Sequence, residues 1–166
     1  KPLRIAPEKI DIRTERSDDM FEIEHLTQRA FWNKHNPGCS EHLLVNRLRD
    51  DPSYLPDISR IAVVGGKPVG CIMYSTANII QPDGRNVPVI TFGPLCVDPG
   101  YQGMGIGGAL LEHTLQLAAD AGHRGVIIYG EPDYYPRFGF RTCDKFGITT
   151  PDGKNFDAFM GYELTP

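Results

Sequence analysis

The stretch from Val97 to Leu111, VDPGYQGMGIGGALL, decides the fold because it places five glycines directly before an apolar, helix-like run. Residues 99–111 carry no charge, and the first acid after Asp98 is Glu112. A helix N-terminus has partial positive charge and unpartnered N–H groups, which acidic residues in the first turn usually satisfy. The pattern therefore predicts that these N–H groups bind an external anion, and that the glycines let it approach the backbone.

Three kinds of glycine-rich turn compete for this stretch. An ATP-type loop ends in Gly-Lys-Ser/Thr, whereas Gly108 is followed by Ala109-Leu110, so that motif is excluded. Gly103, Gly105 and Gly108 do satisfy the dinucleotide pattern G-x-G-x-x-G, and Glu131 follows at a distance suited to a ribose contact. However, five residues separate the preceding strand from the first of these glycines, and only 35 residues follow Glu131. A dinucleotide-binding domain remains the weaker alternative beside another kind of phosphate-binding loop.

The rest of the sequence predicts an α/β (α+β) domain, with hairpins first and one β-α-β crossover in the middle. The expected elements are a strand at 8–16, helices at 19–32 and 41–51, strands at 59–64, 69–79 and 87–98, a helix at 105–121, a strand at 126–130, one helical turn within 131–140, and weaker strands near 141–150 and 155–164.

Several residues predict how these elements begin, end and pack. Ser17 or Asp18 is expected to cap the first helix, Ser40 the second, and Gly122 to end the third. Gly93-Pro94 removes a ladder donor and predicts a bulged or splayed strand. The apolar positions expected to face the core are Leu43, Leu44 and Leu48 in the second helix and Ile106, Leu110, Leu117 and Ala121 in the third, whose stripe Leu111, Leu115 and Ala118 widen.

Composition narrows the class of protein. The 166 residues fit one domain spanning 1–166. Seventeen basic and 21 acidic residues give a formal charge of −4 without a basic cluster, so no nucleic-acid partner is expected. Apolar runs are too short for a membrane span, and the start has no signal-type apolar core. Four widely spaced cysteines without a C-x-x-C motif predict reduced thiols, no metal site and a cytoplasmic protein.

Two motifs identify a family. Residues 102–107, QGMGIG, match the pyrophosphate-loop pattern Q/R-x-x-G-x-G/A, and Tyr135-Pro-Arg-Phe-Gly139-Phe140 matches Y-x-x-x-G-F. Together with the preceding strand and the element order, they make nearly the whole chain resemble the GCN5-related N-acetyltransferases, the GNAT family, and most of all its YhbS-like bacterial branch. The resemblance implies a mixed, mostly antiparallel sheet that splays between its middle strands and is flanked by helices.

The resemblance also implies a co-substrate, acetyl-CoA, and no metal. The strand before the loop would offer backbone groups to the pantetheine arm and the thioester carbonyl, where a donor stabilises the oxyanion. The loop would bind the pyrophosphate through backbone N–H groups and the Gln102 amide. Gln102 stands where many relatives have Arg, which removes one charge from this site. The implied donor-binding residues are Leu95, Cys96, Val97, Gln102, Gly103, Met104, Gly105, Ile106, Gly107 and Gly108.

The implied reaction is direct attack of a primary amine on the thioester in a ternary complex. Tyr135 would be the general acid for the departing thiolate, with Tyr134 as its local rival. Glu131 is a candidate base, and a chain of waters would also suffice. The acceptor, a small-molecule or peptide amine, would meet a wall near Phe31, Trp32, His35 or Asn36.

Two further expectations concern assembly and catalysis. Dimers are common in the family, so a homodimer is a candidate assembly for this chain. The alternative function is a non-catalytic acyl-CoA-binding or sensing module, which would have no need of an acid beside the sulfur.

Overall fold

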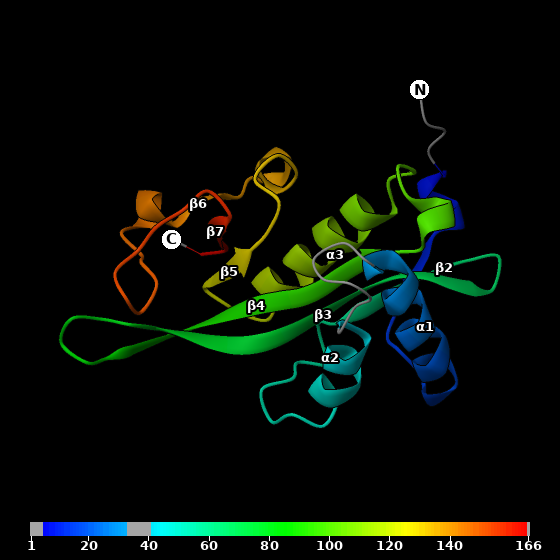
Figure 1. Cartoon of the computed structure of the whole chain (residues 1–166), viewed down its shortest axis with the longest axis horizontal. Coiled ribbons are helices and arrows are strands. Elements are labelled where there is room, and N and C mark those ends of the chain that lie inside the picture. The colour runs from blue at the N-terminus through cyan, green and yellow to red at the C-terminus, as the bar shows by residue number, and fades with distance from the viewer. Residues whose placement is uncertain (1–4, 33–40, 166) are drawn as a thin grey trace. The chain divides into compact units, whose positions relative to one another are not determined.

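The computed structural model describes residues 5–32 and 41–165 and divides into two compact units. Unit 1 comprises Lys1–Tyr74 and Gly93–Thr114, and unit 2 comprises Ser75–Phe92 and Leu115–Pro166. Two long strands and one helix contribute residues to both units (Figure 1).

Seven strands form one mixed sheet in the order β1-β2-β3-β4-β5-β7-β6. Their bounds are Asp11–Arg13 (β1), Arg60–Val64 (β2), Lys67–Ile80 (β3), Asn86–Val97 (β4), Gly125–Tyr129 (β5), Arg141–Thr142 (β6) and Phe159–Glu163 (β7). Among the described residues the helices are Met20–Phe31 (α1), Glu41–Leu48 (α2) and Ile106–Asp120 (α3), with 3-10 turns at Pro7–Lys9 (η1), Ser17–Asp19 (η2), Pro99–Tyr101 (η3), Tyr135–Phe138 (η4) and Cys143–Phe146 (η5).

The pairing of the strands confirms the predicted mixed, mostly antiparallel sheet. β4 and β5 pair in parallel at the register Ile90 with Val126, whereas β5 pairs antiparallel with β7 along its whole length. β1 with β2, β2 with β3, and β6 with β7 are also antiparallel. The parallel pair is joined through α3, which is the crossover that the sequence predicted.

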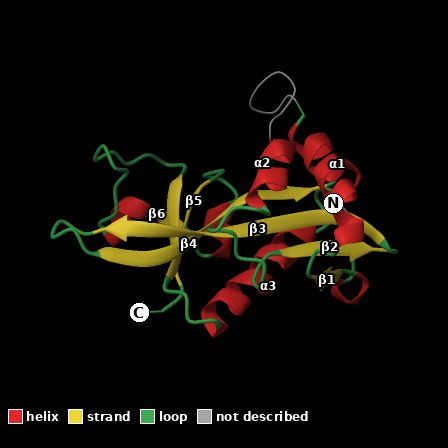
Figure 2. Ribbon diagram, turned by 90° about the horizontal axis from the view of Figure 1, so that it is seen from below, coloured by secondary structure: helices red, strands yellow, loops and turns green. Residues whose placement is uncertain are grey.

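Unit 1 has helices on both faces of its strands (Figure 2). On one face, α1 and α2 pack on β2, β3 and β4 through a buried cluster of Ile23, Leu26, Ala30, Val45, Ile61, Val63, Cys71, Met73 and Cys96. On the other face, Gly70 makes room for α3: a Cβ there would lie 3.1 Å from Leu110 Cδ1 and 3.2 Å from Ile106 Cγ2. The start of α3 therefore packs unusually close to β3.

In unit 2, the C-terminal end of α3 closes as predicted. Gly122 has a φ of 86° and its N–H donates to the Ala119 carbonyl, while the N–H of His123 donates to the Ala118 carbonyl. This pair of bonds is a Schellman motif, which satisfies carbonyls at the helix end and favours glycine at the left-handed position.

The start of α1 corrects the sequence prediction. Ser17 and Asp18 lie in the 3-10 turn η2, and the residue at the helix N-cap is Asp19. The Asp19 carboxylate points backwards, because it accepts hydrogen bonds from the Arg16 N–H at 2.8 Å and from both terminal nitrogens of Arg13 at 2.6 and 3.0 Å. An arginine six residues earlier in the chain thus holds the carboxylate away from the N–H groups of α1, a contact that the helix-capping pattern does not predict.

The buried faces of α2 and α3 also differ from the prediction. Leu43 and Leu44 are exposed, and Val45 is the residue of α2 that is fully buried. In α3, Ala121 lies beyond the helix and is exposed, Leu117 is half-buried, and Thr114 is buried instead. The Thr114 hydroxyl donates back to the Leu110 carbonyl and lies 2.8 Å from the Tyr74 hydroxyl, so a polar residue joins the core with its hydrogen bonds satisfied.

Two strands are less regular than expected. β5 alternates between buried and more open positions and ends at Tyr129, whose side chain is exposed, so it is not uniformly buried. β6 contains two residues, and the 3-10 turn η5 occupies the positions after it where a longer strand was predicted. Gly147 follows this turn with a φ of 70°, which ends it.

Replacing Val45 by Ala tests which side of α2 faces the core. We expect the free energy of unfolding to fall by about 2 kcal/mol, because a fully buried valine loses packed methyl groups. The exposed Leu44→Ala is the matched control and should change it by less than about 0.5 kcal/mol. Urea unfolding measures both, and a larger loss for Leu44→Ala would contradict the assignment.

Candidate functional site

The glycine-rich loop of unit 1 leaves backbone donors available at the start of α3. Gly103 and Gly105 have φ values of 76° and 89°, which residues other than glycine rarely adopt. The first i→i−4 bond of the helix runs from the Ala109 N–H to the Gly105 carbonyl. The N–H groups of residues 106–108 precede that bond, so the helix provides no acceptor for them. The first turn of α3 contains no acid.

The strand before the loop presents backbone groups on the side away from β3. The Asp98 N–H donates to the Val69 carbonyl of β3 at 2.8 Å. Because backbone groups along a strand alternate between its two sides, those of Val97 and Leu95 point away from β3, and those of Cys96 point toward it. The Val97 carbonyl accepts a hydrogen bond from Gln102 Nε2 at 3.1 Å, so this amide bridges strand and loop.

Asp98 fixes the entrance of the loop. Its carboxylate accepts from the Gly100 N–H at 3.0 Å and from Arg29 Nη2 at 2.8 Å, and its carbonyl accepts from the Tyr101 N–H at 2.8 Å. Burial opposes ionisation, but these donors hold the pKa of Asp98 below its ordinary value. The ionised Asp98 carboxylate therefore stabilises the fold at pH values above the ordinary pKa of an aspartate, about 4. This stabilisation is lost as the pH falls through the lowered pKa of Asp98.

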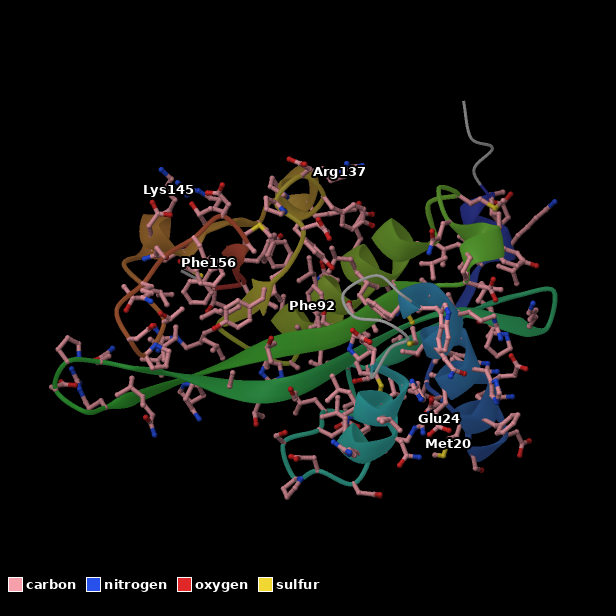
Figure 3. The ribbon with its side chains drawn as sticks, viewed as in Figure 1. Met20, Glu24, Phe92, Arg137, Lys145 and Phe156 are labelled. Atoms are coloured by element: carbon pink, nitrogen blue, oxygen red, sulfur yellow. The ribbon has the colours of Figure 1, made fainter. Side chains whose placement is uncertain are left out.

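Tyr135 begins the 3-10 turn η4 in unit 2, and its ring lies in an aromatic cluster. Its ring centroid is 5.7 Å from that of Phe92 and 5.6 Å from that of Phe140. Phe92 is labelled in Figure 3. A Cβ on Gly130 would overlap the Tyr135 ring, so the absence of a side chain at Gly130 creates the space for it. The ring is thus held between β4, the end of β5 and the Phe140 side chain.

Glu131 and Tyr134 are the other predicted residues of this segment. Glu131 is exposed, and its carbonyl accepts from the N–H groups of Tyr134 at 3.1 Å and Tyr135 at 3.4 Å. The Tyr134 ring packs on Phe138 and lies 5.0 Å from the guanidinium carbon of Arg137, which Figure 3 labels. The two tyrosine rings contact each other, with centroids 5.1 Å apart, and the Tyr135 ring also contacts Phe92 and Phe140.

The Cys96 side chain belongs to the core of unit 1. Its sulfur lies 3.3 Å from that of Cys71 and 3.5 Å from the Thr27 hydroxyl oxygen, and both cysteines are buried. The contact with Cys96 and burial raise the pKa of the Cys71 thiol well above its ordinary value. Reactive cysteines need access to solvent, which the buried Cys96 lacks, so its side chain is assigned to packing of the core.

The predicted acceptor wall is described only in part. Phe31 is half-buried against the core of unit 1, and Trp32 is 55% exposed. His35 and Asn36, together with the predicted cap Ser40, lie outside the described residues.

Two further properties of the described residues concern metal ligands and membrane-spanning helices. Within residues 5–32 and 41–165, no three His, Cys, Asp or Glu side chains form a group that could ligate a metal. Over the same described ranges, no helix combines the length and apolarity that crossing a membrane requires.

The ion pair between Arg29 and Asp98 is not predicted from the sequence. Asp98 is the acid before the loop, but Arg29 is 69 residues away, at a position typical of the charged face of an amphipathic helix. The available signal was a lone acid directly before a predicted anion-binding loop, since such a charge requires a nearby cation to compensate it.

Gly130→Ala tests how the Tyr135 ring is positioned. We expect it to lower the free energy of unfolding by about 1–3 kcal/mol, because the new Cβ must displace the ring. In a Tyr135→Ala background the same change should cost much less, since the overlapping ring is gone. Urea unfolding of the four proteins measures the coupling, and an equal cost in both backgrounds would contradict the assigned contact.

The comparisons with known proteins agree on one family. The Acetyltransferase (GNAT) family profile matches residues 17–140. YjhQ of Escherichia coli K12, an N-acetyltransferase described as uncharacterized, is 35% identical over 127 residues, which are 75% of this chain and 66% of that protein.

Two solved structures of relatives are similar over most of the chain. A GNAT family acetyltransferase from Brucella melitensis in complex with acetyl-CoA has a TM-score of 0.76 and 30% identity, covering 95% of this chain and 89% of the other. YhbS from Escherichia coli in complex with CoA has a TM-score of 0.79 and 26% identity, covering 99% and 84%. The predicted family is confirmed: the chain belongs to the GNAT acetyltransferase family.

Proposed function

We propose that the protein transfers an acetyl group from acetyl-CoA to a primary amine, by direct attack of the amine while both substrates are bound. The observation that carries this proposal is the loop before α3. Its two left-handed glycines and the N–H groups of residues 106–108 suit a pyrophosphate. The Brucella melitensis relative was solved with acetyl-CoA and YhbS with CoA, which supports the same donor here.

The donor's thioester end would meet the strand before the loop. The backbone groups of Leu95 and Val97 on the side away from β3 are free of that strand's ladder. A backbone N–H aimed at the thioester carbonyl would stabilise the negative charge that develops there during attack. The Gln102 amide retains a second N–H besides the one bonded to Val97, and that N–H is the proposed added donor to the pyrophosphate.

Tyr135 is proposed as the general acid that protonates the departing CoA thiolate. A phenol is suited to this role, because it stays protonated near neutral pH and donates a hydrogen bond in that state. Its fixed aromatic surroundings support the assignment, since a catalytic group needs a held geometry. Tyr134, packed beside Arg137, is the control residue.

The experiment that tests the function is a turnover assay with acetyl-CoA and a panel of amines. The panel contains amino acids, polyamines, aminoglycoside-type amines and peptides with a free N-terminus or lysine, and free thiol release reports acetyl transfer. Transfer to at least one amine above the rate of acetyl-CoA hydrolysis is expected. CoA binding without transfer to any of these acceptors would favour the alternative, a non-catalytic acyl-CoA-binding module.

Tyr135→Phe should lower kcat for the acetylated amine by about 100-fold or more, because it removes the proton donor and keeps the ring. The CoA dissociation constant should stay unchanged, since the phenyl ring still fills its place. Steady-state kinetics and calorimetry measure the two quantities.

Tyr134→Phe is the matched control for this variant and should leave kcat within about twofold. An unchanged kcat in Tyr135→Phe would contradict the acid assignment, and a loss in Tyr134→Phe alone would move it to that residue.

Glu131 is proposed as the group that removes the proton from the acceptor ammonium. Glu131→Gln should then lower kcat/KM by about 100-fold, because the amide cannot accept the ammonium proton. Asp133→Asn, two residues further along the same exposed segment, is the control and should keep the wild-type kcat/KM. An unchanged kcat/KM in Glu131→Gln would assign proton removal to water.

A further inference from the structure

The entrance of the glycine-rich loop contains a buried acid, which is an unfavourable neighbour for an anion. Asp98 is 7% exposed and lies five residues before Gly103. The pyrophosphate of the proposed donor is negatively charged, so an uncompensated carboxylate here would repel it in a poorly screened environment. The loop itself offers no compensation, because residues 99–111 are uncharged.

Two cations from other elements of unit 1 compensate Asp98. Arg29 of α1 donates to the carboxylate at 2.8 Å, and Lys67 Nζ at the start of β3 lies 4.0 Å from it. The Arg29 contact is a charge-assisted hydrogen bond, which is stronger than a neutral one. Lys67 is more loosely placed, half exposed and 5.9 Å from the centroid of the Tyr101 ring.

The same carboxylate shapes the backbone that leads into the loop. Its second oxygen accepts from the Gly100 N–H at 3.0 Å, while the main chain of Asp98 bonds to Val69 and Tyr101. A side-chain oxygen is thus needed at position 98, although the charge of the aspartate opposes an anion. A cation that neutralises it resolves the conflict.

We propose that Arg29 and Asp98 form a positioning pair for the donor: Asp98 holds the loop entrance in shape, and Arg29 cancels its charge so that the loop can accept a pyrophosphate. The inference rests on the proposed donor, acetyl-CoA, and assigns no contact between Arg29 and that donor. Because Arg29 lies near the end of α1, two residues before Phe31, the pair also ties this end of the helix to the loop.

The chain contains a matched control. Arg13 and Asp19 form an ion pair of the same residue types, with Nη1–Oδ2 and Nη2–Oδ1 distances of 2.6 and 3.0 Å. This pair fixes the start of α1 rather than the loop. Breaking the Arg13–Asp19 pair also removes an Arg–Asp ion pair. Comparing the two variants therefore separates a loss of stability from a loss of donor affinity.

Calorimetric titration with CoA tests the proposal on the full chain. Arg29→Met should weaken CoA binding about fivefold, because it leaves Asp98 with only the longer and more exposed contact to Lys67. Adding Asp98→Asn to that variant should restore affinity to within about twofold of wild type, because it removes the charge and keeps an oxygen for Gly100. Arg29→Lys should bind nearly as well as wild type, and Arg13→Met should lower the melting temperature while leaving CoA affinity unchanged.

The restoration in the double variant is the decisive result, since a merely structural pair would lose more with each change. Equal CoA affinity in wild type and Arg29→Met, or a further loss in the double variant, would overturn the proposal. The Arg29→Lys protein gives the same test should Arg29→Met fail to fold, because retained charge then predicts retained affinity. Wild-type binding of CoA without acetyl transfer to any amine would contradict the proposed function and would leave these affinity differences intact.

Discussion

Unit 1 depends on one buried carboxylate, because Asp98 joins three elements that are far apart in the chain. Its main chain pairs with Val69 of β3, its side chain fixes Gly100 at the entrance of the loop, and Arg29 of α1 neutralises it. A buried ionised group is costly unless each of its lone pairs and its charge have partners. The backbone of the loop can therefore keep one conformation even though the loop itself has no charged side chain to anchor it.

This arrangement supports the proposal that the uncharged glycine loop binds an anion. The proposed binding uses oriented N–H groups and a helix terminus, and it requires no ion pair between the protein and the ligand. The charged residues Arg29 and Asp98 satisfy one another, and the helix provides no acceptor for the N–H groups of residues 106–108. A mutation of Arg29 or Asp98 would thus change the affinity for the proposed ligand indirectly, through the conformation of the loop and the electrostatic potential around it.

The sequence predicted the order of the elements, the crossover through α3 and the family, because these follow from strong local signals. These signals are the glycines of the loop, Gly122 at the end of a periodic apolar helix, and the alternation of apolar and polar residues in the strands. Each of them depends on only a few neighbouring residues. The errors arose where side-chain contacts, which the local helix pattern does not contain, decided the outcome. Asp19 turned toward Arg13 rather than capping α1, and Val45 rather than Leu44 faced the core because α2 is placed by its packing on α1.

Of the candidate site, the loop glycines and the segment around Tyr135 could be located from motifs, whereas the supporting contacts could not. The Arg29–Asp98 pair spans 69 residues, and the space that Gly130 leaves for the Tyr135 ring depends on the end of β5 lying beside η4. Motif spacing identifies which residues take part. It does not identify what holds them, since that depends on side chains from elements that only the tertiary fold brings together.

The closeness of α3 to β3 at Gly70 has an evolutionary consequence. A methyl group there would press on Leu110, on Ile106 and on the Cys96 carbonyl at 3.1–3.2 Å, so the depth at which α3 sits is set by a missing side chain. Volume at position 70 can increase in a descendant only where volume at 106 or 110 decreases. A size exchange among three core positions would thus accompany any shift of α3, and this shift would also move the proposed anion site at the start of that helix.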